Sequence, residues 1–418
     1  MDLAGVNYRS MKRYRELFAF PNVWVLVLSA FPARVAYGMV ALAIFFKTED
    51  ATGSIAAAGL AIGINSVAGA ATAGLRGMLM DRYGQKWPLR IFVPGYAGMM
   101  LILNTMENRN GILVAAFIMG ITAPPINLSV RPLWRDIVPK DFLRTAYAVD
   151  TSVMSSAGVL GPVIATSLAL SSRPGSPLVV SAIFMLIGGG GLAITKVSRN
   201  WIPEKKEENH TSLWRNKAIQ LLMIEGCFIG FGWGVFDVAV PAFATLEDVP
   251  HRTAWILAAM GIANIFGGLL GGLVSKKVSA LKAMRVTYFV WIFISIPIVF
   301  TYPGWSMVIA ATFLGLVGGT IQVFYWEVME AVRPKGSAVG MMGWIWTVEG
   351  TLMSIGAAAG GWIAEKYSPR FALSITCFTI ITGFIILTLG RKRLAAADRI
   401  PTEEEDLAAM SDNLPTTK

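Results

Sequence analysis

Four charged residues lie inside long apolar stretches of this sequence, where a charge needs a partner, water or a function. Arg34 and Glu349 each lie about twelve residues from the ends of their stretches, while Glu225 and Asp237 share a third stretch. Placing a charge at the centre of a bilayer costs about 2.5 to 3.5 kcal/mol on insertion scales. We therefore expect these four side chains to bind a substrate or protons, or to form buried salt bridges.

The spacing of these residues along a helix limits which of them can share a site. Glu225 and Asp237 are twelve residues apart, about 18 Å at 1.5 Å per residue, so they cannot form one site. Arg34 and Glu349 are predicted to lie at similar depth, and one hypothesis is that they meet across a central cavity. The alternative is that each is hydrated, or is paired within its own part of the chain.

Other chemistry has few residues to carry it. The two histidines, His210 and His251, are too few for a histidine-based metal site, and Cys227 and Cys377 lie inside apolar stretches. The sequence has neither a phosphate-binding glycine loop nor a Ser, His and Asp constellation. We therefore expect no enzyme activity, no metal and no cofactor.

The composition indicates an all-α integral membrane protein. Of the 418 residues, 55% are hydrophobic and 15% are charged, and the mean hydropathy is +0.58; soluble proteins carry about 25% charged residues. An apolar run of about 18 residues or more can cross a bilayer. Twelve such spans are predicted, at 22–46, 53–75, 89–104, 111–131, 147–169, 176–195, 217–245, 253–274, 286–302, 306–328, 337–360 and 371–390.

The basic residues predict the orientation of these spans. With the N-terminus in the cytoplasm, the tails and the even-numbered connections carry 29 of the 36 lysines and arginines, and the odd-numbered connections carry six. Positively charged loops favour the cytoplasm, so we expect a multi-pass protein of the cell (inner) membrane with both termini cytoplasmic. The net charge of +10 then fits contact with the lipid bilayer rather than with nucleic acid. Charges near the predicted cytoplasmic ends of spans, Arg131, Asp150, Glu327 and Glu330, are interpreted as gate or interface charges.

A repeat divides the chain into two parts. Gly77 and the five residues after it resemble the six residues from Gly271, at an offset of 194, and Gly161 matches Gly356 at an offset of 195. These matches predict two six-helix halves with a substrate path between them near the midplane. The predicted segments are a cytoplasmic N-terminal segment (1–21), an N-terminal six-helix half (22–196), a cytoplasmic linker (197–216), a C-terminal six-helix half (217–391) and a cytoplasmic tail (392–418).

The connection between the second and third spans carries a family signature. Its residues Gly77, Asp81, Arg82, Gly84 and Lys86 resemble the signature of the major facilitator superfamily, a glycine followed by an aspartate, a basic residue, a second glycine and a further basic residue. The two glycines permit close approach or a tight turn, and an aspartate is favoured at a helix N-terminus. The resemblance implies that these residues gate the cytoplasmic side, with the aspartate holding a helix end of the other half.

Two further stretches bear on direction and substrate. Gly161 and Pro162, in the fifth span, resemble in degraded form the signature of proton-exchanging exporters, and the proline is predicted to kink the helix. Aromatic residues such as Trp233, Tyr325 and Trp346 crowd the second half. They either pack against helices and lipid or line the path, in which case the cavity suits an amphipathic solute.

We interpret the chain as a secondary active transporter that resembles the bacterial drug-efflux members of this superfamily. The expected activity is proton-coupled efflux of a small amphipathic compound by alternating access, with a small-molecule substrate, protons and lipid as partners. One alternative is an importer of a small metabolite by symport or uniport. Another is a non-transporting membrane sensor on the same fold.

Overall fold

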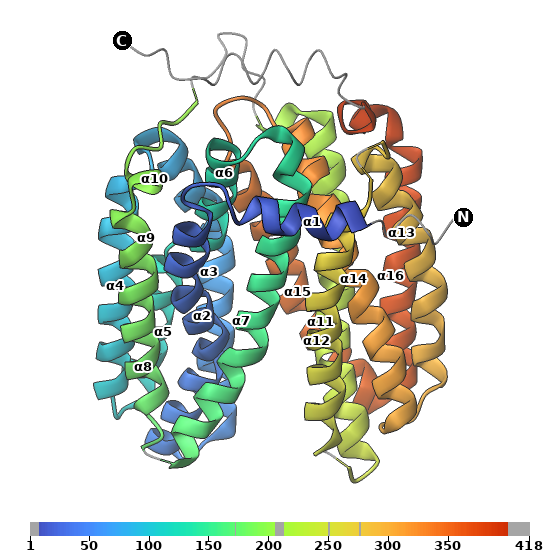
Figure 1. Ribbon diagram of the computed structural model, residues 1–418. Helices are drawn as coiled ribbons and strands as arrows, with labels where there is room; N and C mark the ends of the chain where they lie inside the picture. Colours follow the sequence, from blue (N-terminus) through green and yellow to red (C-terminus); the bar gives the residue numbers. More distant parts are fainter. Residues whose placement is uncertain (1–7, 172, 205–212, 250, 276, 400–418) are drawn as a thin grey trace.

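The computed structural model describes residues 8–171, 173–204, 213–249, 251–275 and 277–399, and every regular element within these ranges is a helix (Figure 1). The first group of helices comprises α2 (Val23–Thr52), α3 (Ile55–Tyr83), α4 (Lys86–Thr105), α5 (Arg109–Thr122), α6 (Ile126–Ile137), η2 (Lys140–Phe142), α7 (Leu143–Ser171), α8 (Ser176–Met185), η3 (Leu186–Gly190), α9 (Gly191–Ile194) and α10 (Lys196–Arg199).

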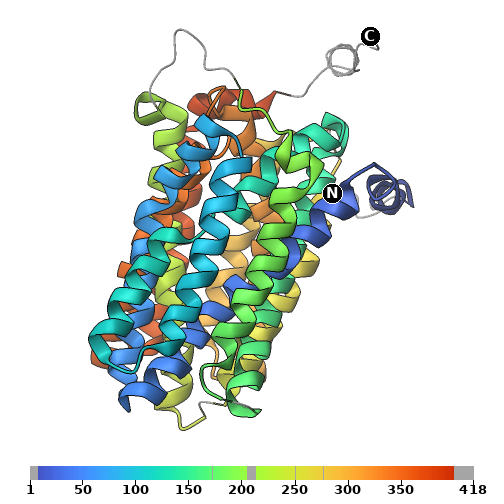
Figure 2. The ribbon, with the colours of Figure 1, turned by 90° about the vertical axis from the view of Figure 1, so that its left-hand side faces the viewer.

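The second group comprises η4 (Leu213–Arg215), α11 (Lys217–Leu246), α12 (Arg252–Leu273), α13 (Ala280–Ser295), η5 (Ile296–Phe300), α14 (Trp305–Val332), α15 (Gly340–Lys366), α16 (Pro369–Leu389) and η6 (Arg391–Asp398). A short helix, α1 (Tyr8–Leu17), precedes both groups. The two groups stand side by side in Figure 1, and Figure 2 faces the first group, whose helices run along the long axis of the molecule. Parts of three predicted segments, at 1–7, 205–212 and 400–418, lie outside the described residues.

Ten helical segments of the described chain are long and apolar enough to cross a membrane. Helices α4 and α15, which occupy the third and eleventh predicted spans, fall outside that set, so the count of twelve stays a prediction. The location of α15 explains its composition. It packs on α3 on one side and on α11 on another, and at such helix contacts small residues such as Gly343 and Gly356 replace large apolar ones.

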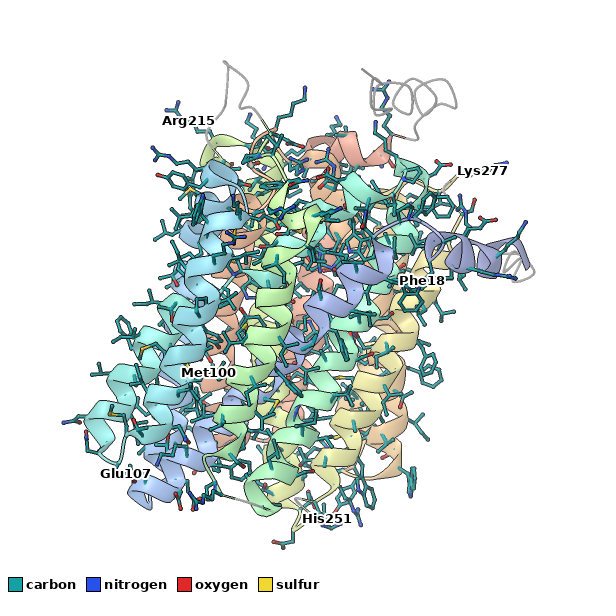
Figure 3. All side chains as sticks on the ribbon, turned by 60° about the vertical axis from the view of Figure 1, so that its left-hand side comes forward. Phe18, Met100, Glu107, Arg215, His251 and Lys277 are labelled. Atoms are coloured by element: carbon teal, nitrogen blue, oxygen red, sulfur yellow. The ribbon has the colours of Figure 1, made fainter. Side chains whose placement is uncertain are left out.

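The two ends of the molecule differ in the residues they carry. Arg215 and Lys277 lie at one end, here named the inner end, and Glu107 and His251 lie at the other, here named the outer end (Figure 3). Helix α1 lies at the inner end, across α7 (Figure 1). The Tyr14 hydroxyl donates a hydrogen bond of 2.5 Å to the Leu269 carbonyl on α12. This first helix therefore joins the two groups at the inner end.

Proline and glycine interrupt two of the predicted spans. The fourth span divides into α5 and α6 at Ala123, Pro124 and Pro125, because proline has no N–H to donate and disfavours helix in the residue before it. The Pro124 carbonyl, which lies in this break, accepts a hydrogen bond from the Tyr37 hydroxyl. The sixth span passes through the π-helix η3, where Gly188 packs against the backbone of Ala33. Both interruptions fix side chains and backbone groups of α2.

The predicted repeat is visible in helix packing. A Cβ atom added at Gly161 of α7 would lie 2.6 Å from the Cα of Gly38 on α2, and one added at Gly356 of α15 would clash with the Phe231 carbonyl on α11. The two groups contact each other through α3 against α15 and α7 against α12. The same helix pairing thus recurs within each group and again between the groups.

Candidate functional site

A cavity of about 530 Å³ lies between the two groups of helices. Tyr37 and Arg76 line it from the first group, and Asp237 and Glu349 line it from the second. Most of the other lining side chains are apolar or aromatic, among them Trp346. Such a cavity has the size and the mixed lining of a small-molecule site.

The structure places two of the four predicted intramembrane charges in this cavity. Asp237, on α11, is exposed in its wall, whereas Glu349, on α15, is partly buried. Glu349 also lines a second cavity, of about 240 Å³, together with Glu225 of α11. Asp237 and Glu225 therefore belong to different cavities, as their spacing on one helix predicted.

Arg34 has a partner within its own half, which is the alternative that the sequence analysis left open. Its Nη2 lies 2.6 Å from Asp150 Oδ1, and its Nε donates to the Asn127 side chain at 3.1 Å. Arg131 approaches the same carboxylate at 3.5 Å, and all three charged side chains are buried. In this structure Arg34 is therefore paired within the first half and does not meet Glu349. Asp150 lies in the buried core, which corrects its interpretation as a charge near the helix end.

A carboxylate caps a helix between the two halves at the inner end. Asp81 Oδ1 accepts from the Val339 N–H at 2.9 Å, and Oδ2 accepts from the Gly340 N–H at 2.6 Å. These amides open α15, so the negative charge faces the positive end of the helix dipole. The contact joins the two halves, as the family signature implied; its role as a gate stays a prediction.

The other residues of the signature surround this contact in different ways. A Cβ atom added at Gly77 would lie 2.7 Å from the Val339 carbonyl, and Gly84 ends α3 with φ of 74°. Close approach and a tight turn are thus both present. Arg82 is exposed over the ring of Tyr83, and Lys86 lies over the ring of Trp87. These two cations therefore lie over neighbouring aromatic rings instead of over the opposite half.

A second inter-half contact uses an arginine that the sequence analysis did not single out. Arg144, near the start of α7, binds Glu327 with two hydrogen bonds, of 2.7 and 3.1 Å. It also donates to the carbonyls of Val274, Ser275 and Val278, just beyond the end of α12. A cation is favoured at a helix C-terminus, so Arg144 completes the α7 and α12 interface. In the sequence, Arg144 lies in a predicted connection between two spans, and no motif there distinguishes it from other basic residues.

Further ion pairs lie at the inner end around the linker. Glu204 binds Arg333 with bonds of 2.7 Å and Arg135 with one of 2.8 Å. Arg135 also pairs with Glu330 at 3.0 Å across the two halves. Glu327 and Glu330 are therefore interface charges, as predicted.

The structure also places Gly161, Pro162 and Arg76. Gly161 packs on Gly38 of α2, within the first half. Helix α7 continues through Pro162 to Ser171, and the kink at this proline stays a prediction. Arg76 was assigned to a connection, but α3 extends seven residues beyond it, so its side chain is buried beside the cavity. Hydropathy alone missed this because charged residues end an apolar window before they end a helix.

Sequence comparison identifies the family. The Major Facilitator Superfamily profile matches residues 26–357, and the chain therefore belongs to the major facilitator superfamily. An uncharacterized MFS-type transporter, y4rN, of Sinorhizobium fredii is 24% identical over 386 residues, which span 86% of this chain and 93% of the relative. The multidrug efflux pump Tap of Mycolicibacterium fortuitum is 24% identical over 188 residues, 44% of each chain.

Solved structures share the fold at low sequence identity. The human organic anion transporter MFSD10 superposes with a TM-score of 0.69 at 13% identity, covering 90% of this chain and 99% of that one. A bacterial homologue of the iron transporter ferroportin, in an outward-facing state with soaked iron, gives a TM-score of 0.71 at 10% identity, covering 87% and 98%. These likenesses show the major facilitator fold.

Proposed function

We propose that this member of the major facilitator superfamily is a proton-coupled exporter of a small amphipathic compound that works by alternating access. The observation that carries the proposal is the cavity of about 530 Å³ between the halves, in which Asp237 and Glu349 interrupt a largely apolar and aromatic wall. Such a wall suits an amphipathic solute, and a carboxylate at this depth can take up a proton. The partial match to a multidrug efflux pump supports the same direction.

The state of the transporter follows from where its halves touch. The described hydrogen bonds between the halves extend from the middle of the helices, where Ser155 binds Asn264 and Thr347 binds Ala70, to the inner end, where Asp81 binds the start of α15. We infer that the inner side is closed and that the cavity opens toward the outer end. Transport then requires these inner contacts to break and the outer ends of the halves to approach.

The orientation in the membrane forms part of the proposal, with the inner end cytoplasmic. In a background with Cys227 and Cys377 replaced by alanine, Asn110→Cys at the outer end should react with a membrane-impermeant maleimide added to whole cells. Lys277→Cys should react only after permeabilisation. Both original side chains are exposed, so access decides the result. Reversed labelling would overturn the orientation.

Transport in proteoliposomes tests the activity itself. A fluorescent amphipathic dye should move against its gradient when a pH gradient is imposed, and should not do so without one. With a neutral dye, Glu349→Gln should abolish proton-driven movement while retaining exchange of dye for dye, whereas Glu365→Gln, an exposed carboxylate on the same helix, should behave as the unmodified protein. Movement only down the dye gradient would indicate a uniporter, uptake together with protons an importer, and no movement of any solute a sensor.

A further inference from the structure

The second cavity lies entirely within the second half of the chain. Its volume is about 240 Å³, and helices α11 to α15 all contribute to its wall. Its lining residues are Glu225, Gly226, Ile229, Trp233, Asn264, Tyr288, Trp291, Gly318, Ile321, Gln322, Tyr325 and Glu349. Glu349 also lines the central cavity, so this residue forms part of the wall of both cavities.

The wall of the second cavity carries negative groups without a balancing cation. Glu225 is 1% exposed, and one of its carboxylate oxygens accepts a hydrogen bond from the Tyr288 hydroxyl. Its other oxygen, Oε2, is buried without a hydrogen-bond partner, as is the Tyr325 hydroxyl. No lysine, arginine or histidine is among the described residues that line the cavity. A buried carboxylate in this setting calls for a bound cation or a proton.

Aromatic residues share this wall with the two carboxylates. The rings of Tyr288 and Trp291 have centroids 5.6 Å apart, and those of Trp291 and Trp233 are 5.9 Å apart. The face of an aromatic ring attracts a cation within about 6 Å of its centroid, and clusters of such rings recognise quaternary ammonium groups. The wall therefore combines the two features that select an organic cation, carboxylates without a basic partner and a cluster of aromatic rings.

The size of the cavity narrows the ligand further. A bare Mg²⁺ or Ca²⁺ would need six or more oxygen ligands at about 2.0 to 2.6 Å, whereas only four of the twelve described lining residues carry a carboxylate or amide side chain and the others are aromatic, aliphatic or glycine. At 240 Å³ the cavity is also smaller than the roughly 300 to 1,000 Å³ of pockets that hold a whole drug-sized ligand. It has room for a headgroup, and the rest of a longer molecule can extend past Glu349 into the central cavity.

We propose that this cavity binds the protonated amine or quaternary ammonium headgroup of the transported compound, with its charge between Glu225 and Glu349 and its apolar body in the central cavity. The inference rests on the proposed function, because it assigns the substrate class of the same transporter. It also explains why two carboxylates are kept in the second half without a basic partner. An amphipathic monocation is then the preferred substrate.

Binding of a matched pair of probes to the purified full chain tests this assignment separately from transport. Benzyltrimethylammonium carries a permanent charge, and neopentylbenzene has the same shape without it. The cation should raise the unfolding temperature and quench tryptophan fluorescence saturably, and the neutral probe should do neither. Glu225→Gln and Glu349→Gln should each weaken binding of the cation at least tenfold, whereas Glu365→Gln should change it less than twofold.

A steric variant keeps the test valid if a charge variant folds poorly. A Cβ atom added at Gly318 would meet Asn264, Trp233 and Trp291 at 3.5 to 3.9 Å, which is ordinary contact. Gly318→Leu should therefore fold, fill the cavity and abolish binding of the cation with both carboxylates intact.

Each outcome separates the site from the activity. Equal affinity for the two probes, or unchanged affinity in Glu225→Gln, Glu349→Gln and Gly318→Leu, would overturn the headgroup site. A response to pH that is independent of the charge of the probe would assign the carboxylates to protons alone and would also overturn it. Proton-driven transport of a neutral dye without ammonium binding would leave the proposed function standing. Ammonium binding without transport would leave the site standing.

Discussion

The two halves share a helix plan but treat buried charge in opposite ways. In the first half, Asp150 is paired with Arg34 and approached by Arg131, so a buried anion is balanced. In the second half, Glu225 and Glu349 line a cavity with tyrosine hydroxyls and no described basic residue. The repeat offset of 195 places Ile229 at the position of Arg34. The buried ion pair of the first half therefore has no counterpart at the matching position of the second half.

This difference implies that buried charges have different roles in the two halves. A balanced buried pair costs desolvation but leaves no site for a ligand, because each charge already has its partner. A buried carboxylate without a basic partner still attracts a cation or a proton that enters the cavity. We therefore expect the buried pair of Arg34 and Asp150 to stabilise the fold, and the carboxylates Glu225 and Glu349 to bind.

The largest effect is expected from removing the anion of the first half. Asp150→Asn would leave Arg34 and Arg131 buried without a carboxylate, which typically costs about 3 to 5 kcal/mol. Glu225→Gln removes an unbalanced charge and keeps an acceptor for Tyr288, so it should leave stability unchanged or raise it. Thermal unfolding in detergent, followed by fluorescence-detected gel filtration, measures both.

Glu365→Gln provides the control, since its exposed carboxylate should contribute less than about 0.5 kcal/mol. Equal destabilisation by Asp150→Asn and Glu225→Gln would contradict the comparison. It would mean that Glu225 also has a stabilising cation in the folded protein. Arg34→Gln offers a second check, because Asp150 would retain Arg131 and the loss should be smaller than for Asp150→Asn.

The two inter-half contacts at the inner end are related by the same repeat. Asp81 matches Ser275 at an offset of 194, and Val339 matches Arg144 at an offset of 195. In one contact the side chain of Asp81 binds the Val339 amide, and in the other the side chain of Arg144 binds the Ser275 carbonyl. The same two positions thus meet twice, with an acid at a helix N-terminus once and a base at a helix C-terminus once.

Among variants of the contacts between the halves, Arg144→Gln should weaken the closed inner end most. Its guanidinium makes five hydrogen bonds across the halves, and bonds to charged groups contribute about 1.5 to 3 kcal/mol each. Loss of even one should shift the balance toward the inward-open state by tenfold or more. Spin labels at Asn110→Cys and Trp305→Cys, on the outer ends of the two halves, would report this in double electron–electron resonance as a larger fraction of short distances.

The sequence predicted the general plan and one of these contacts, for reasons that differ by residue. Apolar runs predict the helices, and glycine spacing indicates the repeat. Asp81 lies in the family signature, which implies that it contacts a helix end of the other half. The hypothesis that Arg34 meets Glu349 rests on depth alone, but depth does not fix the face of a helix, and the face of α2 that carries Arg34 points to Asp150. Tyr288 is 63 residues from Glu225 in the sequence. Hydropathy predicts each helix, but it does not predict which side chains of two helices form a hydrogen bond.

Asp81→Asn should have a smaller effect than Arg144→Gln. The amide still offers one acceptor oxygen to the start of α15 but loses the charge–dipole attraction, which contributes about 0.3 to 2 kcal/mol. The same spin-label pair should show a shift of about 2- to 30-fold in the ratio of states, with normal folding and reduced transport. Asp81→Glu tests the geometry with the charge kept. A well-folded Asp81→Asn protein with unchanged populations and unchanged transport would exclude the gating role.

The smallest effect is expected from Tyr14, which adds a contact outside the repeat. Its hydroxyl donates from α1 to the Leu269 carbonyl of α12, and burial raises the pKa of this phenol above its ordinary value, so it stays a donor at physiological and moderately alkaline pH. Tyr14→Phe removes one neutral hydrogen bond, about 0.5 to 1.5 kcal/mol, and should shift the spin-label populations by about 2- to 12-fold in the same direction as Asp81→Asn. Tyr367→Phe, at an exposed tyrosine of the outer end, should change nothing. A shift equal to that of Arg144→Gln would mean that α1, and not the repeated helices, holds the inner side closed.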